Sequence, residues 1–395
     1  MTDWKASPTR PSRRARRFAA AAAPTRAREA LERRWYHRLV FEPSLATLVT
    51  ARQTRLEPFH RWFPLRQGFA PELVRLFLHE TAPTRVKNTL PLLDPFSGSG
   101  TTVVECARQR TAALGIEASP ALVFLTQASF AREFPELPDL PATQAMERLA
   151  ASLFTPVHRA ALMLAVARGH TSRGTMKNSV PPIRERLAEV TAMMQADLSE
   201  PLPLVNQVQR GDARRLGLES ACVGAILTSP PYLSRHDYGR ILAPLERAYR
   251  LWYEASMDPE HPHRLRATKG KALVAPSTHR SMPEAVEEAG EALIRTGHEQ
   301  LAGAVMAYFD DLFAVIQECR RVLADGGQCW MVLGGSRLSN TYVPTDLIVA
   351  EYALAYRFHV NRMLVARRLI TPGRKLGTLQ GISPRESILV MTASE

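Results

Sequence analysis

The segment TSPPY, residues 228–232, follows directly on the apolar run VGAIL. That run has the composition of a short buried strand, and a Pro-Pro pair cannot continue a strand because proline donates no ladder hydrogen bond. The chain must therefore leave the sheet at Ser229. Since ligands of α/β proteins bind at the carboxyl ends of strands, this segment is a candidate site. Its residues are Ser229, Pro230, Pro231 and Tyr232.

A second candidate is the glycine-rich turn DPFSGSGTT, residues 94–102. Gly98 and Gly100 let the backbone bend sharply and let a ligand approach its N–H groups, as in nucleotide-binding strand-to-helix turns. The turn is not a P-loop, because no GK[ST] follows, and it is not the GxGxxG dinucleotide pattern.

Two acidic residues follow later strands. Glu117 ends the next apolar run, about 20 residues downstream of the turn, where it could hydrogen-bond a ribose. Asp212 follows a further run and could meet an adenine amine. For each acid alone, a helix cap or a surface carboxylate is the favoured explanation. Their placement after successive strands favours a binding role.

The elements that must position these residues alternate between strands and helices, which predicts a doubly wound, mostly parallel α/β sheet. The expected strands lie at 90–96, 111–119, 204–214, 223–232 and 327–336, with a closing antiparallel pair at 358–369 and 386–393. Residues 135–203, which look largely helical, and 233–300 are both too long for a strand-to-helix connection of about 2–6 residues. We therefore expect each to be an inserted subdomain or a functional loop.

Composition limits the class of protein. The 395 residues are 45% hydrophobic and 23% charged, enough for a large globular core. The four cysteines form no CxxC pair, and the histidines lack metal-ligand spacing, so neither a disulfide framework nor a metal site is predicted and a reducing cytoplasm fits best. No apolar run approaches the ~20 residues that span a bilayer.

The positive charge is concentrated at the N-terminus. Residues 1–40 contain eleven Lys/Arg and three acids, a net +8 of the total +13. Such a tail suits attraction to a phosphate backbone, but a solubilising tail explains it equally well. Its alanine run is too short for a targeting signal with an h-region of ~7–15 residues. From Pro24 to Val40 the spacing is helical, with Leu31, Trp35 and Leu39 on one face.

In this order, DPFSGSGTT, GIEASP, GDAR and TSPPY resemble the S-adenosylmethionine-dependent amino-methyltransferases of DNA, and TSPPY is similar to the N4-cytosine branch. The resemblance covers about residues 55–120, 204–250 and 320–393. It implies a Rossmann-like seven-stranded methyltransferase fold, S-adenosyl-L-methionine as cofactor and double-stranded DNA as substrate. By that similarity the cofactor is held by Asp94, Pro95, Phe96, Ser97, Gly98, Ser99, Gly100, Thr101, Thr102, Glu117, Asp212 and Ala213.

The resemblance also implies how the prolines work. The Ser229 hydroxyl and the Pro230 carbonyl would accept the two hydrogens of an exocyclic amine, and the prolines would hold that carbonyl rigidly. Tyr232 would stack on a base flipped from the duplex, which offsets part of an unstacking cost of a few kcal/mol. Transfer would be direct, with no covalent enzyme intermediate. Serine at the first position favours cytosine N4.

Further residues are carried over less specifically. The segment 58–78, with His60, Arg61 and Trp62, is similar to the family segment that helps to hold the methionine part of the cofactor. For each DNA-contact candidate, a helix cap or a solvated loop is an equally good interpretation. The candidates for contact with DNA are Arg235, Asp237, Tyr238, Arg374 and Lys375.

These expectations divide the chain. The predicted parts are a basic tail and helix (1–40), the cofactor-binding half (41–134), a helical insertion (135–203), the catalytic segment (204–250), a second insertion (251–300) and the C-terminal part of the methyltransferase domain (301–395). Either insertion could read the DNA sequence. We expect a cytoplasmic, nucleoid-associated enzyme, with a restriction endonuclease as a potential partner. Adenine N6 in DNA, an RNA amine and nucleic-acid binding without catalysis stay open as alternatives.

Overall fold

One large sheet organises the molecule. The computed structural model describes residues 26–51, 53–65, 68–81, 90–141, 145–170, 179–203, 206–233, 237–253, 282–339, 341–369 and 384–394. Within these residues, eight strands form a sheet in the order β1-β9-β10-β6-β5-β2-β3-β4. Its strands are β1 (Leu39–Phe41), β2 (Leu92–Asp94), β3 (Ala113–Glu117), β4 (Gln207–Arg210), β5 (Val223–Thr228), β6 (Leu323–Gly334), β9 (Phe358–Arg368) and β10 (Arg385–Ala393).

The strand order confirms the predicted doubly wound topology. From β2 the chain adds β3 and β4 on one side, then crosses to place β5 and β6 on the other, and all these neighbours pair in parallel. Strand β10 lies antiparallel between β6 and β9, and β9 and β10 are the expected closing pair. Because the order reverses between β2 and β5, a crevice forms outside the carboxyl ends of these strands. The protein therefore has a Rossmann-like α/β fold.

The eighth strand is a difference from the sequence expectation. The N-terminal helix α2 (Arg26–Trp35) was expected to continue to Val40, but it gives way to a 3₁₀ turn at Tyr36–Arg38 and then to β1. Strand β1 pairs in parallel with β9, with Leu39 opposite Met363. The apolar residues 39–41 suit a strand as well as a helix face, and pairing with the sheet decides between them.

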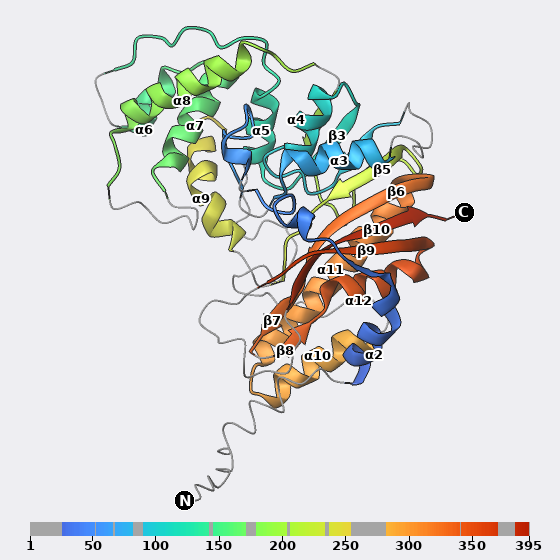
Figure 1. Ribbon diagram of the computed structural model, residues 1–395. Coiled ribbons are helices and arrows are strands. Elements are labelled where there is room, and N and C mark those ends of the chain that lie inside the picture. The colour runs from blue at the N-terminus through green and yellow to red at the C-terminus, as the bar shows by residue number, and fades with distance from the viewer. Residues whose placement is uncertain are drawn as a thin grey trace, which may run out of the picture.

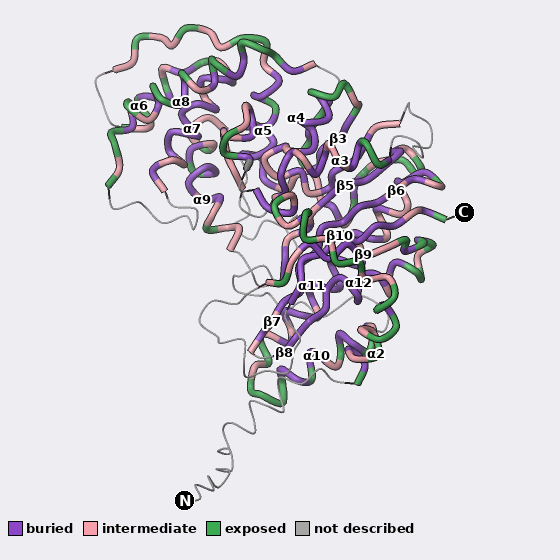
Figure 2. Tube along the Cα trace, viewed as in Figure 1, coloured by how far each residue is buried: buried purple, intermediate pink, exposed green. Residues whose placement is uncertain are grey.

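Successive residues of the strands face two different cores. Trp330 and Val332 of β6 pack with Phe77 on one face, while Cys329 and Met331 join the core on the opposite face. This period of two is the signature of a strand buried on both sides. The central strands are accordingly buried along most of their length (Figure 2).

Helices cover both faces (Figure 1). Helices α10–α12 with α2 share a core with one face, whereas α3 packs on the other. The described helices besides α2 are α3 (Pro71–Thr81), α4 (Thr101–Arg108), α5 (Pro120–Ala128), α6 (Met146–Ala151), α7 (Pro156–Arg168), α8 (Ile183–Leu198), α9 (Tyr238–Tyr249), α10 (Glu284–Arg295), α11 (Glu299–Val322) and α12 (Thr345–Ala355). A short hairpin, β7 (Ser336–Leu338) and β8 (Thr341–Val343), precedes α12, and further 3₁₀ turns lie at Pro43–Ala46 and Gln53–Arg55. None of these described helices is long and apolar enough to cross a membrane.

The first predicted insertion is helical. Its helices α6, α7 and α8 form a separate hydrophobic core with α5 and α9, and they make the lobe at the upper left of Figure 1. The second predicted insertion divides differently. Helix α10 packs against α11 and α2 and so belongs to the core beneath the sheet, and residues 254–281 lie outside the described residues.

Candidate active site

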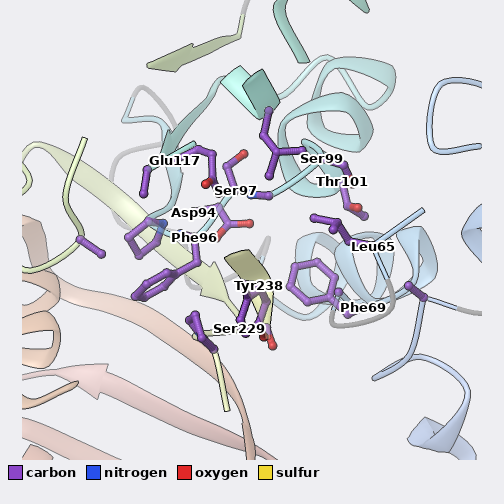
Figure 3. Close-up of a pocket in the computed structure, with 18 of the residues that line it drawn as sticks. Leu65, Phe69, Asp94, Phe96, Ser97, Ser99, Thr101, Glu117, Ser229 and Tyr238 are labelled. Carbon is purple, nitrogen blue, oxygen red and sulfur yellow. Dashed lines mark hydrogen bonds between the residues drawn. The ribbon is translucent and has the colours of Figure 1, made fainter. Parts of the chain in front are cut away.

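A cavity lies at the carboxyl ends of β2, β3 and β5, at the crevice that the strand order predicts (Figure 3). It brings the glycine-rich turn and the TSPPY segment together, although about 130 residues separate them in the chain. The lining residues are Ala51, Thr54, Leu65, Gly68, Phe69, Asp94, Pro95, Phe96, Ser97, Gly98, Ser99, Thr101, Glu117, Ala118, Leu122, Gly211, Ala213, Ser229, Pro231, Tyr238 and Leu242.

The glycine-rich turn needs its glycines. Gly98 has φ +55° and Gly100 has φ +85°, a left-handed region that residues with a Cβ rarely adopt. A Cβ on Gly100 would also lie 2.4 Å from the Thr126 Cγ2 atom of α5. The turn can therefore approach both α5 and the cavity only with glycine at this position.

Asp94 holds the turn in place. This buried carboxylate accepts hydrogen bonds from the Thr102 hydroxyl at 2.6 Å, the Thr228 hydroxyl at 2.8 Å and the Phe96 N–H at 3.1 Å. It thereby joins the glycine-rich turn to the residue directly before Ser229. Burial raises the pKa of Asp94 to about 6, even though the three hydrogen bonds act to lower it.

Glu117 is positioned by backbone donors. Its Oε2 atom accepts from the Gly98 N–H at 2.9 Å and its Oε1 atom from the Ser119 N–H at 2.8 Å. Ser119 in turn donates its hydroxyl to Glu246 of α9 at 3.1 Å. These contacts fix the carboxylate at the cavity wall, where the sequence predicted it (Figure 3).

Asp212 is placed differently from the expected adenine contact. Its Oδ2 atom lies 2.7 Å from Arg214 Nη2, and Arg214 also pairs with Asp311 of α11 at 3.1 Å. The neighbours Gly211 and Ala213 line the cavity, whereas Asp212 is not among the lining residues. Arg214, which sequence analysis did not single out, therefore turns the Asp212 carboxylate toward α11.

The TSPPY segment is held from several directions. Tyr308 of α11 donates its hydroxyl to the Pro231 carbonyl at 3.0 Å, and Ser336 donates to the Leu233 carbonyl at 2.9 Å. The Thr228 hydroxyl binds Asp94 at the other end. Ser229 and Pro231 line the cavity, while Pro230 between them is buried. The segment is thus fixed by hydrogen bonds in addition to its two prolines.

Tyr232 departs from the expected position. Its ring is only 7% exposed and does not line the cavity. It lies over Gly334, where an added Cβ would come within 2.5 Å of the ring, and its hydroxyl donates to Glu386. The ring therefore faces the start of β10 in this structure. It is not in a position to stack on a base in the cavity, which is the role expected from sequence.

Helix α9 closes another side of the cavity. Tyr238 and Leu242, one helical turn apart, both line it. Asp237 accepts from the Arg240 N–H at 3.0 Å and so caps the helix, which is one of the two interpretations that the sequence left open. The other predicted DNA contacts, Arg235, Arg374 and Lys375, lie outside the described residues.

The segment before the glycine-rich turn supplies three residues of the cavity lining that the sequence analysis did not name. Leu65, Gly68 and Phe69 face the cavity, whereas Arg61 and Trp62 do not. Arg61 and Trp62 instead bind Asp197 of α8, the indole N–H at 2.8 Å. They attach this wall of the cavity to the helical lobe.

His60 joins a charged cluster behind the same wall. In the described chain, Glu57, His60 and Glu105 have ligand atoms within 4.8 Å of one another, close enough to consider a metal ion. Arg75 contacts Glu57 at 2.6 Å and Glu105 at 2.9 Å. Burial would raise the pKa of Glu105, but His60 and Arg75 lower it to about 2. Arginine thus already neutralises these carboxylates.

A doubly wound sheet with a glycine-rich turn and an acidic residue at successive strand ends defines a Rossmann-like protein with a nucleotide-type site. No protein-family model matches the chain. Type II methyltransferases named M.AvaI from Nostoc sp. and from Anabaena variabilis are each 24% identical over 449 residues, which cover 89% of this chain and 91% of the relative. Over nearly its whole length the chain is therefore similar to a methyltransferase.

Solved structures give weaker likenesses. TrmN from Thermus thermophilus has a TM-score of 0.35 at 13% identity, covering 86% of this chain and 53% of that chain. A geranyl diphosphate methyltransferase in complex with SAM has a TM-score of 0.35 at 10% identity, covering 87% and 95%. At these scores the fold assignment rests on the strand order itself.

Proposed function

We propose that the protein transfers a methyl group from S-adenosylmethionine to the N4 amine of a cytosine flipped out of double-stranded DNA. One observation carries the proposal: Ser229 and Pro231 line the same cavity as Gly98 and Glu117. An amine held by the TSPPY segment and a donor held by the glycine-rich turn would therefore be neighbours. Similarity to a type II methyltransferase supports methyl transfer as the reaction.

S-adenosylmethionine is the methyl donor, and the cavity suits it. Glu117 is oriented at the wall by two N–H donors and has further acceptor capacity for ribose hydroxyls. Phe96, Leu65 and Phe69 add apolar walls, and Gly98 allows close approach of the backbone. When bound, the cofactor supplies an electrophilic methyl group on a sulfonium.

The protein's task is to prepare the amine, whose lone pair is delocalised into the base. The Ser229 hydroxyl and the Pro230 carbonyl accept its two hydrogens and localise that lone pair. Their positions are set in advance by Thr228, which binds Asp94, and by the Pro231 carbonyl, which binds Tyr308. Preorganised acceptors of this kind cost no rearrangement during the reaction.

The test is to incubate the purified protein with labelled S-adenosylmethionine and unmethylated plasmid DNA, digest to nucleosides and identify the product by mass spectrometry. N4-methylcytosine is expected. Ser229→Ala should lower kcat about 100-fold or more, as for the loss of one preorganised polar contact, without weakening cofactor binding. Ser152→Ala, at the end of α6 and not among the cavity-lining residues, is the matched control.

Other products would redirect the proposal. N6-methyladenine would keep the mechanism and overturn the choice of base. Bound cofactor without any methylated DNA would point to an RNA amine or to binding without catalysis. Pairing with a restriction endonuclease is a separate part of the proposal, which is tested by whether methylated plasmid resists cleavage by an endonuclease encoded beside this protein.

A further inference from the structure

Helix α9 has two chemically different sides. Tyr238 and Leu242 line the cavity, Glu246 accepts from Ser119, and Tyr249 packs against Phe124 of α5. These residues recur every three or four positions, so they occupy one side of the helix. Glu246, which is buried, is the only acidic residue within α9.

The opposite side carries arginines. Arg240 and Arg247 in α9, and Arg250 at its C-cap, are all exposed. A spacing of seven residues places Arg240 and Arg247 on the side opposite the cavity, and Arg250, one turn after Glu246, lies at the border of that side. A rise of 1.5 Å per residue spreads the three arginines over about 15 Å. A single DNA strand presents about four phosphates over that length.

These arginine side chains have no carboxylate partner among the described residues. Arg240 contributes its backbone N–H to Asp237, but its guanidinium forms no ion pair there, and neither do those of Arg247 and Arg250. Some exposed arginines elsewhere do form ion pairs, for example Arg33 with Glu29 and Arg362 with Glu80. The arginine side of α9 is thus a positive surface that no carboxylate of the described residues neutralises.

We propose that this surface, Arg240, Arg247 and Arg250, binds the phosphate backbone of the DNA that flanks the target base. The inference rests on the proposed function. Because the inner side of α9 lines the cavity that contains Ser229, a duplex delivering a base to that cavity would pass near the helix. Phosphate contacts of this kind fix the position and orientation of the duplex without reading its sequence.

The test compares Arg247→Gln/Arg250→Gln with a matched control, Arg110→Asn/Arg132→Gln. The control arginines are also exposed, but they follow α4 and α5 at the amino-terminal edge of the sheet, away from the cavity. Asparagine suits position 110 because φ there is +52°. Binding of a fluorescein-labelled mixed-sequence DNA duplex is measured by anisotropy at several salt concentrations, together with cofactor affinity and Tm.

The α9 variant should bind DNA about tenfold or more weakly, and the slope of log K against log salt should fall by about 1 for each arginine removed. Cofactor affinity and Tm should not change, and the control should bind like the wild type. If the α9 variant keeps the wild-type salt slope while the wild type methylates DNA, the proposal that these arginines bind phosphate is overturned and the proposed function is retained. Equal losses in both variants would also overturn the surface. A wild type that binds cofactor but neither binds nor methylates DNA overturns the function and the surface together.

Discussion

The Tyr232 hydroxyl lies 2.8 Å from Glu386 Oε1, although 154 residues separate the two in the chain. The other oxygen of Glu386 accepts from Arg367 at 2.5 Å, and Glu386 is only 3% exposed. This contact joins the end of the TSPPY segment to the first residues of β10. It orients a tyrosine ring that already rests on Gly334.

Removing that hydroxyl should loosen the segment without removing the ring. We expect Tyr232→Phe to lose a hydrogen bond to a charged group, worth about 1.5–3 kcal/mol, and to lower kcat/KM for DNA methylation with cofactor affinity unchanged. Gly334→Ala should be more severe, because its Cβ would enter the space of the ring. Steady-state kinetics and cofactor titration distinguish these effects. Weakened cofactor binding in Tyr232→Phe would contradict the expectation.

Gly100→Ala should destabilise the protein by about 2–4 kcal/mol, the sum of a left-handed backbone penalty and a clash with Thr126. Urea denaturation measures the loss. Adding Thr126→Ala should restore the part of the unfolding free energy that the clash removes, and should leave a loss of about 1–2 kcal/mol from the left-handed backbone. Thr126→Ala alone is the control, since its buried hydroxyl has no partner among the described residues. Absence of any recovery would mean that the backbone conformation alone excludes alanine.

Asp94 should make stability depend on pH. Its pKa rises from 3.8 to about 6 on folding, so the folded protein binds the proton more tightly than the unfolded chain. The stabilisation of the folded state by this tighter proton binding is fully present below pH 4 and is lost as the pH rises through 6. The stability of wild type minus that of Asp94→Asn should therefore fall by up to about 3 kcal/mol between pH 4 and pH 7. Denaturation at several pH values checks this, and a difference that stays constant would refute the assignment.

Glu117→Gln should weaken cofactor binding about 10- to 100-fold. An amide offers one acceptor oxygen, so its NH₂ group would face one of the two N–H donors that now bind the carboxylate. Calorimetry with S-adenosylhomocysteine measures the change. Ser229→Ala, at the opposite wall, should bind this ligand like the wild type, and an equal loss in both variants would argue against separate roles.

Chelation should leave the protein unchanged. Because Arg75 and Arg108 neutralise Glu57 and Glu105, an ion is not needed to stabilise that cluster. We expect dialysis against EDTA to leave Tm and cofactor affinity as they were. A fall in Tm that zinc or another divalent ion restores would show that Glu57, His60 and Glu105 bind metal after all.

The sequence by itself determined where most of the strands lie and which two segments, DPFSGSGTT and TSPPY, are candidates for the site. Short apolar runs, a glycine-rich turn and a Pro-Pro pair are local features whose consequences do not depend on distant residues. They pointed to Gly98, Glu117 and Ser229, and the rule that ligands bind at strand ends predicted that these residues meet, as they do in one cavity.

Tertiary structure alone decided the partners of the polar side chains. Arg214 pairs with Asp311 of α11, and the Tyr232 hydroxyl binds Glu386, because folding places these groups together and a buried polar group must find a partner where it lies. Strand β1 forms at Leu39–Phe41 because β9 is available to pair with it. Such contacts join residues far apart in the chain, and no local pattern of residue types encodes them.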